Sequence, residues 1–324
     1  MGPVVTVCIP TFQRLHYLKE AVSAALAQTV QNIEVLISDD GNTEQIRAWA
    51  ELAVKSDSRV RYRRNPTNLG LGGNWNECVA AARGEWLVIQ GDDDRLLPTF
   101  CEALLSLAKS DSAVVFSNHY LIDEHGTRLE KESRAWTARY GRSALVRGRV
   151  QDAARCVWSN AVPMSSALIR TAHAKRLGVK PDLNTPEIEV FARLVAEGAH
   201  FEHEPAYLVE FRTHAGSATT AGLFTERLVQ YLEPIAVPAN AEGTKRAFLA
   251  SLTKNAVDRL LRLGERTRAA EIMRSPYYPR SWSDPTLVAQ ALAVRAPAAI
   301  STQAYLFARK LHGARKSWRK RVPS

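Results

Sequence analysis

Three consecutive carboxylates, Asp92, Asp93 and Asp94, come directly after the apolar segment 85–90. A buried strand that ends in acids holds them rigidly at the edge of a sheet. Oxygen-rich clusters of this kind suit hard cations such as Mg²⁺ or Mn²⁺, and a bound cation would relieve the repulsion between the neighbouring acids. Aspartate is also a common turn residue, so an acidic, solvated turn is the alternative interpretation.

The segment 85–90 belongs to a regular alternation of strand and helix patterns over the first hundred residues. Apolar runs predict strands at 4–9, 33–37 and 85–90, and a short strand is predicted at 60–64. Apolar residues at helical spacing predict helices at 15–26, 43–56 and 74–82. A loop at 65–73 precedes the last of these helices. Further along, a helix is predicted to start at Pro98, a strand at 113–116 and a helix at 186–194. This order predicts an α/β fold in which helices cover both faces of a parallel sheet.

Ligands bind such sheets at the C-terminal ends of the strands. Three polar clusters are expected at that edge: Pro10, Thr11 and Phe12 after the first strand, Asp39 and Asp40 after the second, and the three aspartates after the fourth. Their convergence is stronger evidence for a site than the acid run alone. The turn 10–14 has no glycine and the loop 65–73 matches neither G-x-G-x-x-G nor a P-loop, which disfavours a Rossmann dinucleotide site and a P-loop NTPase.

The composition restricts the class of protein and its expected location. The 324 residues carry a net charge of +10, but no acid follows Asp284 while eight Lys or Arg do, so the rest of the chain holds 35 basic and 33 acidic residues. A nearly neutral core argues against a nucleic-acid-binding groove. The chain has no apolar run near 18 residues, its first residues resemble a strand and not a signal peptide, and its four cysteines lack metal-site spacing, so a cytoplasmic protein is expected.

The residues after about 222 have a helical pattern throughout. Helices are predicted at 224–233, 244–263, 266–274, 285–295 and 298–321. The last of these mixes aromatic and aliphatic residues with seven Lys or Arg. Such a helix is typical of a membrane-surface anchor, and a solvated helix that packs on the preceding domain is the equal alternative.

In their order along the chain, these blocks resemble the family-two inverting glycosyltransferases. The matching segments are 7–14, 33–41, 68–86, the acid run as the metal-binding D-x-D, 187–194, and Arg212 with His214, within residues 4–217. The resemblance implies the GT-A fold, a Rossmann-like mixed sheet with helices on both faces, here with a C-terminal helical extension. It implies a catalytic domain at 1–217, with a nucleotide-binding half at 1–95 and an acceptor half at 96–217, followed by a helical region at 218–324.

The resemblance also implies a role for each matching residue. Donor nucleotide binding falls to Pro10, Thr11, Phe12, Arg14, Asp39, Asp40, Asn68, Gly70, Asn76, Asp92 and Asp93. Asp92, Asp94 and His214 would hold Mg²⁺ or Mn²⁺, with Asp93 as an alternative ligand and diphosphate binding as an alternative role of His214. Glu187 would be the general base that takes the proton of the acceptor hydroxyl. Alternatively, Glu187 is an exposed carboxylate favoured by the helix dipole.

The implied function is metal-dependent, inverting transfer of a hexosyl group from a nucleotide-diphosphate donor, preferably a UDP-sugar, to a glycan or lipid-linked acceptor in cell-surface polysaccharide synthesis. The expected location is the cytoplasm, with the basic tail at the inner face of the plasma membrane. Pro186 replaces the first acid of the family's usual pair, and Asn74-Trp75 stands where a basic residue is common. The alternatives are a sugar-nucleotide-binding or scaffolding protein with a decayed site, and a nucleotidyltransferase, which the glycine-free turn 10–14 disfavours.

Overall fold

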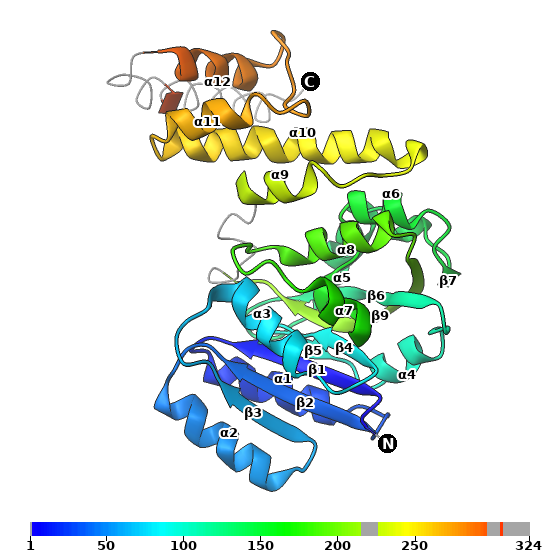
Figure 1. The fold of residues 1–324 in the computed structure, drawn as a ribbon. Coiled ribbons are helices and arrows are strands. Elements are labelled where there is room, and N and C mark those ends of the chain that lie inside the picture. Colours follow the sequence, from blue (N-terminus) through cyan, green and yellow to red (C-terminus); the bar gives the residue numbers. More distant parts are fainter. Residues whose placement is uncertain (1, 215–225, 297–304, 307–324) are drawn as a thin grey trace. The chain divides into compact units, whose positions relative to one another are not determined.

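A mixed β-sheet forms the centre of the first of two units in this computed structural model, which describes residues 2–214, 226–296, 305 and 306 (Figure 1). The first unit comprises 1–223 with 235–241, and the second comprises 224–234 with 242–324. Among the described residues, nine strands form one sheet. They are β1 (Val5–Thr11), β2 (Ile33–Asp39), β3 (Val60–Arg64), β4 (Trp86–Ile89), β5 (Arg95–Leu96), β6 (Ser112–Ile122), β7 (Gly148–Arg149), β8 (Ala167–Arg170) and β9 (His200–Arg212).

The sheet has the strand order β3-β2-β1-β4-β8-β6-β9-β5, and β7 pairs with β9. The first four strands are parallel, as the sequence predicts. The strand β8 is antiparallel to both β4 and β6, and β5 and β7 are antiparallel to β9. The strands β6 and β9 pair in parallel. The sheet is therefore mixed, which confirms the fold class implied by the resemblance.

Helices cover both faces of the sheet because alternate residues of each strand point to opposite sides (Figure 1). Val5, Val7 and Ile9 pack into one core with α1 (Leu15–Leu26), α2 (Glu44–Ser56) and α4 (Phe100–Leu105). Cys8 points the other way, and its thiol donates to the carbonyl of Cys78 in α3 (Gly70–Ala81). The two-sided burial explains why these strands are almost continuously apolar. All four cysteines are buried free thiols, as predicted.

The remaining helices of the first unit lie after β5. They are α5 (Glu130–Arg139), α6 (Ala153–Trp158), α7 (Thr171–Leu177) and α8 (Pro186–Ala196), with short 3₁₀ helices η1 (Arg142–Ala144) and η2 (Met164–Ser166). The helix α8 begins at Pro186, at the favoured first position for proline, as the sequence predicts.

The prediction of a loop over 65–73 is wrong in its second half, because α3 begins at Gly70. The Asp40 carboxylate accepts hydrogen bonds from the backbone N–H groups of Leu69 and Gly70, which starts the helix early. Gly72 allows close packing. A Cβ at Gly72 would lie 2.4 Å from the carbonyl oxygen of Lys180, so only glycine lets α3 approach the segment 178–183 this closely.

Two other boundaries differ from the sequence predictions. The helix α4 begins at Phe100 and not at Pro98, because the N–H of Leu97 still donates to the Leu208 carbonyl beside β9. The strand predicted at 113–116 is the longer β6, and it pairs with β9, a strand that the sequence analysis missed. The strand β9 was missed because buried charged residues such as Glu202 interrupt its apolar pattern.

The second unit is helical, as predicted. It contains α9 (Glu226–Leu232), α11 (Arg266–Ile272), α12 (Pro285–Arg295) and most of α10 (Ala239–Arg262). The predicted basic helix at 298–321 lies outside the described residues, apart from Tyr305 and Leu306. Over the part of the chain that the structure describes, no helix combines the length and apolar character needed to cross a membrane.

We predict that Gly72→Ala destabilises the protein although alanine favours helices. Helix propensity would stabilise the variant by about 1 kcal/mol. The new methyl group would meet three carbonyl oxygens, those of Lys180, Leu183 and Pro181, at 2.4, 2.8 and 2.9 Å. Overpacking of this kind costs about 1–3 kcal/mol and should prevail. Urea unfolding measures the difference.

The control for this prediction is Gly243→Ala in α10, where a Cβ would meet no atom within 4 Å. This variant should gain about 0.5–1 kcal/mol. If Gly72→Ala were as stable as the parent protein, the close approach of α3 to the segment 178–183 would be refuted.

Candidate active site

The ends of β1, β2 and β4 meet at one edge of the sheet. Thr11 pairs with Asp39 across β1 and β2, and Cys8 pairs with Ile89 across β1 and β4. The Thr11 hydroxyl donates to Asp92 Oδ2 at 2.7 Å, and the N–H of Phe12 lies 3.4 Å from the same oxygen. The structure thus brings two of the three predicted clusters into direct contact, while Pro10 and Thr11 belong to the strand itself.

Asp39 and Asp40 are buried, and their carboxylates accept hydrogen bonds from several neighbouring segments of the chain. Asp39 accepts hydrogen bonds from the N–H of Gly41 and the hydroxyl of Tyr62, both at 2.9 Å. Asp40 accepts from the amide of Asn65 at 2.9 Å, besides the two N–H groups that start α3. The contacts of these carboxylates within the protein are therefore structural, and their contact with a base stays a prediction.

Two further residues of the predicted donor site also have structural contacts. Asn68 Oδ1 accepts from the N–H of Gly70 at 2.8 Å, which reinforces the start of α3. Asn76 Oδ1 accepts from the N–H of Val179 at 3.0 Å. Asn76 therefore ties α3 to the segment that precedes Glu187, and nothing in its contacts points to a nucleotide.

Arg14, Asp92, Asp93 and His214 form a connected cluster beside this edge. The Arg14 guanidinium is hydrogen-bonded to Asp92 Oδ1 through Nη2 and donates to Asp93 Oδ2 through Nη1 at 2.8 Å. His214 Nε2 lies 2.9 Å from Asp93 Oδ2 and 3.3 Å from Arg14 Nη1. Residues 14, 92–93 and 214 are far apart in sequence, and the family resemblance was the only signal that joined them.

Asp94 is buried like Asp92 but has different partners. Its Oδ1 accepts from the N–H of Arg212 at 3.0 Å, and its carboxylate is hydrogen-bonded to the side chain of Ser165. Burial and the charge of Asp93 raise the pKa of Asp94 to about 8. Burial also raises the pKa of Asp92 to about 6, although Arg14 acts against that shift. Ser165, in η2, was missed because a lone serine carries no signal.

Arg212 holds in place the turn formed by Asp92, Asp93 and Asp94, which we call the acid turn. Its Nε donates to the Asp93 carbonyl at 2.9 Å, its Nη1 to the Glu124 carbonyl at 3.0 Å, and its Nη2 to Glu20 Oε2 at 2.6 Å. Its side chain is 1% exposed, and the guanidinium stacks 4.6 Å over the ring of Tyr17. The resemblance included Arg212 in a motif but implied no function for it. Its contacts show that it stabilises the position of the acid turn.

Glu187 stands in the first turn of α8, directly after Pro186. Its Oε2 is buried and has no hydrogen-bond partner among the described residues. Burial raises the pKa of this carboxyl to about 7. Glu189 differs as the helix geometry predicts, since it is buried and paired with Arg193 at 2.6 Å. The exposed-carboxylate interpretation of Glu187 does not fit its buried oxygen.

The donor set suits a hard divalent cation although its oxygens are engaged by protein groups. Within 2–214 and the other described residues, no three His, Cys, Asp or Glu side chains are arranged around a common metal position. Arg14 is bonded to Asp92 and Asp93, whereas the guanidinium of Arg212 is bonded to Glu20 and to backbone carbonyls. The cluster therefore has an excess of negative charge, carried by oxygen atoms of the kind that Mg²⁺ and Mn²⁺ prefer.

Solved structures share this architecture. The S. aureus protein TarS, solved in complex with UDP-GlcNAc, superimposes with a TM-score of 0.65 at 13% identity over 97% of this chain and 92% of that chain. The mannosyltransferase PcManGT from Pyrobaculum calidifontis, in complex with GDP-Man and Mn²⁺, gives a TM-score of 0.56 at 16% identity over 96% and 87%. The fold is of the GT-A class with C-terminal helices, as the resemblance implied.

The sequence profile of "Glycosyl transferase family 2" matches residues 6–171, more than half of the chain. The protein belongs to this family. GlyG of Streptococcus pneumoniae is 31% identical over 125 residues, 38% of this chain. A "GalNAc(5)-diNAcBac-PP-undecaprenol beta-1,3-glucosyltransferase" of Campylobacter jejuni is 32% identical over 131 residues, 40% of this chain. The matched region spans 42% of the length of each of these relatives.

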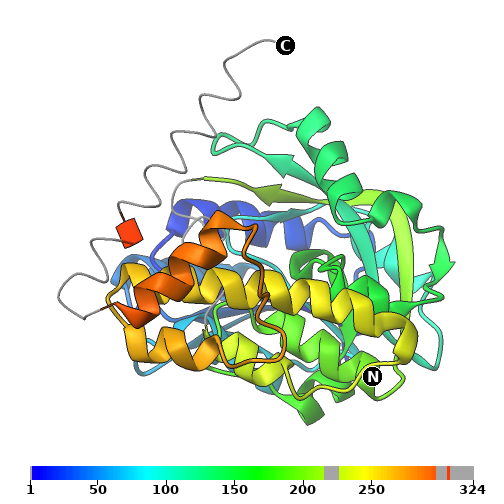
Figure 2. The same cartoon turned by 90° about the horizontal axis from the view of Figure 1, so that it is seen from above.

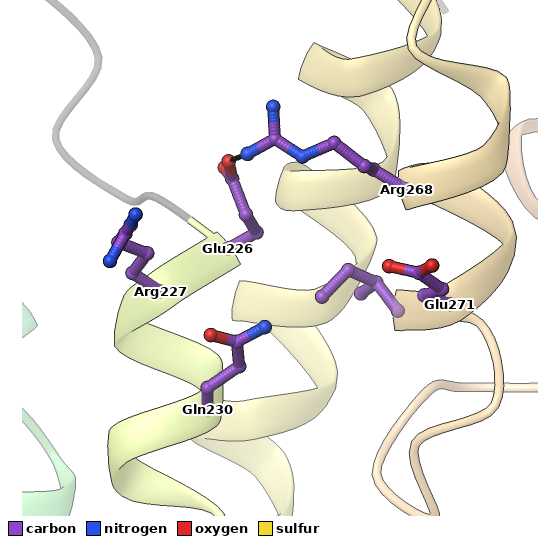
Figure 3. A pocket seen from close by; sticks show the side chains of 6 residues that line it. Glu226, Arg227, Gln230, Arg268 and Glu271 are labelled. Carbon is purple, nitrogen blue, oxygen red and sulfur yellow. Dashed lines mark hydrogen bonds and ion pairs between the residues drawn. The ribbon is translucent and has the colours of Figure 1, made fainter.

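The helical unit has a hollow of its own, between α9 and α11 (Figure 3). It measures about 470 Å³ and is lined by Glu226, Arg227, Gln230, Arg268, Glu271 and Ile272. The Arg268 guanidinium is paired with Glu226 and with Glu265. Its lining contains acidic, basic and amide side chains but no hydroxyl or thiol nucleophile. We therefore locate the candidate active site at the edge of the sheet.

We predict that Arg212→Met unfolds at much lower urea concentration than the parent protein. The change would leave the carbonyls of Asp93 and Glu124 without their buried donor and would remove one of the two arginine partners of Glu20. Losses of this kind cost about 3 kcal/mol or more in total.

Arg128→Met is the control, because Arg128 is also paired with a glutamate, Glu210, but its own side chain is 40% exposed. A half-exposed pair is worth about 1 kcal/mol or less. Equal losses for the two variants would show that Arg212 is no anchor of the acid turn.

Proposed function

We propose that this protein is a metal-dependent, inverting glycosyltransferase that moves a hexosyl group from a nucleotide-diphosphate donor to an acceptor hydroxyl. The observation that carries the proposal is the contact of Thr11 and Phe12, at the end of β1, with Asp92 after β4. It joins the predicted nucleotide side of the sheet to the acid turn, within the segment matched by the family profile.

The donor nucleotide would lie against the ends of β1 and β2. Phe12 is 46% exposed although it is aromatic, and it lies beside Gly41, which follows the pair Asp39 and Asp40. An exposed ring offers a base a stacking surface. TarS is described with UDP-GlcNAc and PcManGT with GDP-Man. We propose a UDP-sugar as the donor of this protein.

Asp92, Asp94 and His214 would hold Mg²⁺ or Mn²⁺, with Asp93 as the alternative ligand. The ion would act as a Lewis acid for the departing diphosphate. Thr11, Ser165 and the N–H of Arg212 orient the two buried carboxylates by hydrogen bonds. Arg212 and Glu20 keep the turn in place from behind. The charge excess of the turn and the Mn²⁺ described for PcManGT support this assignment.

Glu187 would act as the general base in a single displacement. The acceptor oxygen attacks the anomeric carbon as the bond to the diphosphate breaks, and the hydroxyl proton passes to the Glu187 carboxylate. A base works best when its pKa is near the working pH, and burial gives Glu187 a pKa of about 7. Inversion follows because the attack comes from the face opposite to the leaving group.

The acceptor would be a glycan or a lipid-linked glycan in cell-surface polysaccharide synthesis. The name of the Campylobacter jejuni relative specifies an undecaprenol-linked acceptor, which supports the lipid-linked class. The transfer reaction would then take place at the cytoplasmic face of the plasma membrane, where the basic C-terminal residues would bind anionic lipid.

A thermal-shift titration with UDP, GDP, CDP and dTDP, each with and without Mn²⁺, tests the donor assignment. We expect the melting temperature to rise most with UDP, and only when Mn²⁺ is present, because the ion bridges the diphosphate to the acid turn. A ligand at one hundred times its Kd should add about 2.7 kcal/mol of stability. Stabilisation by none of the four nucleotides would favour the decayed-scaffold alternative.

Glu187→Gln tests the general base. We expect transfer to fall by about 10²–10⁴-fold while UDP affinity is unchanged. In the parent protein, transfer should rise with pH and level off above about pH 7, because only the ionised carboxylate accepts the proton. Loss of UDP binding together with transfer would instead assign Glu187 to the donor site.

Stability gives an independent check on the same variant. The folded pKa of Glu187 is raised, so the parent protein binds an extra proton when folded and loses stability as the pH rises from about 4.5 to about 7. Glutamine carries no charge at any pH. Glu187→Gln should therefore match the parent protein at pH 4.5 and exceed its stability at pH 8. An exposed carboxylate would give no such gain.

A further inference from the structure

Arg14 places a positive charge where the acid cluster would receive a metal ion. Its guanidinium bonds to Asp92 and Asp93 and lies 3.3 Å from His214 Nε2. Arg14 thus contacts three of the four side chains proposed to be metal ligands or their alternatives. Asp94 is the exception, and its oxygens are engaged by Arg212 and Ser165.

The two arginines of the cluster differ in their freedom to move. Arg212 is almost fully buried and donates to groups on two separate segments besides the acid turn, the carbonyls of Asp123 and Glu124 and the carboxylate of Glu20. The side chain of Arg14 is 32% exposed, and it is hydrogen-bonded to Asp92, Asp93 and His214. Arg14 is the N-cap of α1, and its carbonyl accepts from the N–H of Leu18 at 3.0 Å, so the side chain can swing while the backbone stays.

A guanidinium and a divalent ion cannot occupy the same carboxylate oxygens. Their like charges repel, and each Asp92 or Asp93 oxygen that ligates the ion is lost to Arg14. Once displaced, the guanidinium remains tethered two residues from Phe12, the proposed stacking partner of the base. A planar guanidinium is well suited to bidentate contact with phosphate oxygens.

We propose that Arg14 is an exchangeable counter-cation: it neutralises Asp92 and Asp93 in the free protein, is displaced by the divalent ion, and then binds the diphosphate of the donor. This inference rests on the proposed function, because it needs the metal and the donor to share the acid turn. It makes the two ligands cooperative, since the metal releases the group that the diphosphate binds. By linkage, the donor must strengthen metal binding by the same factor.

Isothermal titration calorimetry with MnCl₂ alone tests whether the metal ion displaces Arg14 from Asp92 and Asp93. Arg14→Met removes the competitor for Asp92 and Asp93, so the variant should bind Mn²⁺ about tenfold more tightly than the parent protein in the absence of nucleotide. Lys19→Met is the control, because it removes one positive charge from an exposed position on the same helix. It should leave the Mn²⁺ affinity within about twofold of the parent value.

Titration with UDP at saturating Mn²⁺ tests the second part of the proposal, the contact between Arg14 and the diphosphate. Arg14→Met should bind UDP about tenfold more weakly, and Lys19→Met should match the parent protein. An Mn²⁺ affinity that is unchanged or weaker in Arg14→Met would overturn the exchange while leaving the proposed function standing. Unchanged UDP affinity would overturn the diphosphate contact. Failure of the parent protein to bind Mn²⁺ even with UDP present would overturn both proposals.

A crystal of the parent protein soaked in MnCl₂ gives a test that needs no variant. The exchange requires the Arg14 guanidinium to leave Asp92 Oδ1 when the ion is bound. A guanidinium still bonded to Asp92 beside an ordered Mn²⁺ would overturn the proposal, even if Arg14→Met failed to fold.

Discussion

The site depends on how three adjacent aspartates are held at the end of a buried strand. Side by side in a low-dielectric environment they would repel one another and favour a different turn. Arg212 prevents this, because its backbone N–H donates to the Asp94 carboxylate and its guanidinium donates to the Asp93 carbonyl. The same guanidinium reaches Glu20 on α1 and the carbonyl of Glu124. One side chain thus joins the ends of β4, β6 and β9 to α1 and fixes where any ligand of the acids must lie.

The sequence alone could predict the nucleotide side of the fold, because both faces of β1, β2 and β4 are buried there. Apolar runs then stand out, and the polar residues that end them, such as Thr11 and Asp92, are conspicuous. The mixed sheet was implied by resemblance only. The antiparallel pairing of β8 with β4 joins residues 86–87 to 169–170, and no local pattern encodes a partner at that separation.

The unpredicted features depend on partners that are distant in sequence. Glu202 is fully buried in β9 and looks unlike a strand residue until Arg149 is seen to neutralise it at 2.7 Å. Arg212 and Ser165 gain their meaning only from the acid turn, more than seventy residues away in each case. The start of α3 was misjudged because glycines suggest a loop, whereas here the carboxylate of Asp40 supplies the missing start signal.

The helix α3 sets the spacing between the two sides of the candidate site. Its first turn is bound to Asp40 at the end of β2, and Gly72 and Asn76 on its body contact the segment 178–183 that leads into Glu187. Arg193 of α8 binds the carbonyls of Leu177 and Gly178 from the other side. The segment that leads into Glu187 is thus held between two helices, α3 and α8. Substitutions at 178–185 should therefore change how far the Glu187 carboxylate reaches towards an acceptor, while the acid turn keeps its geometry.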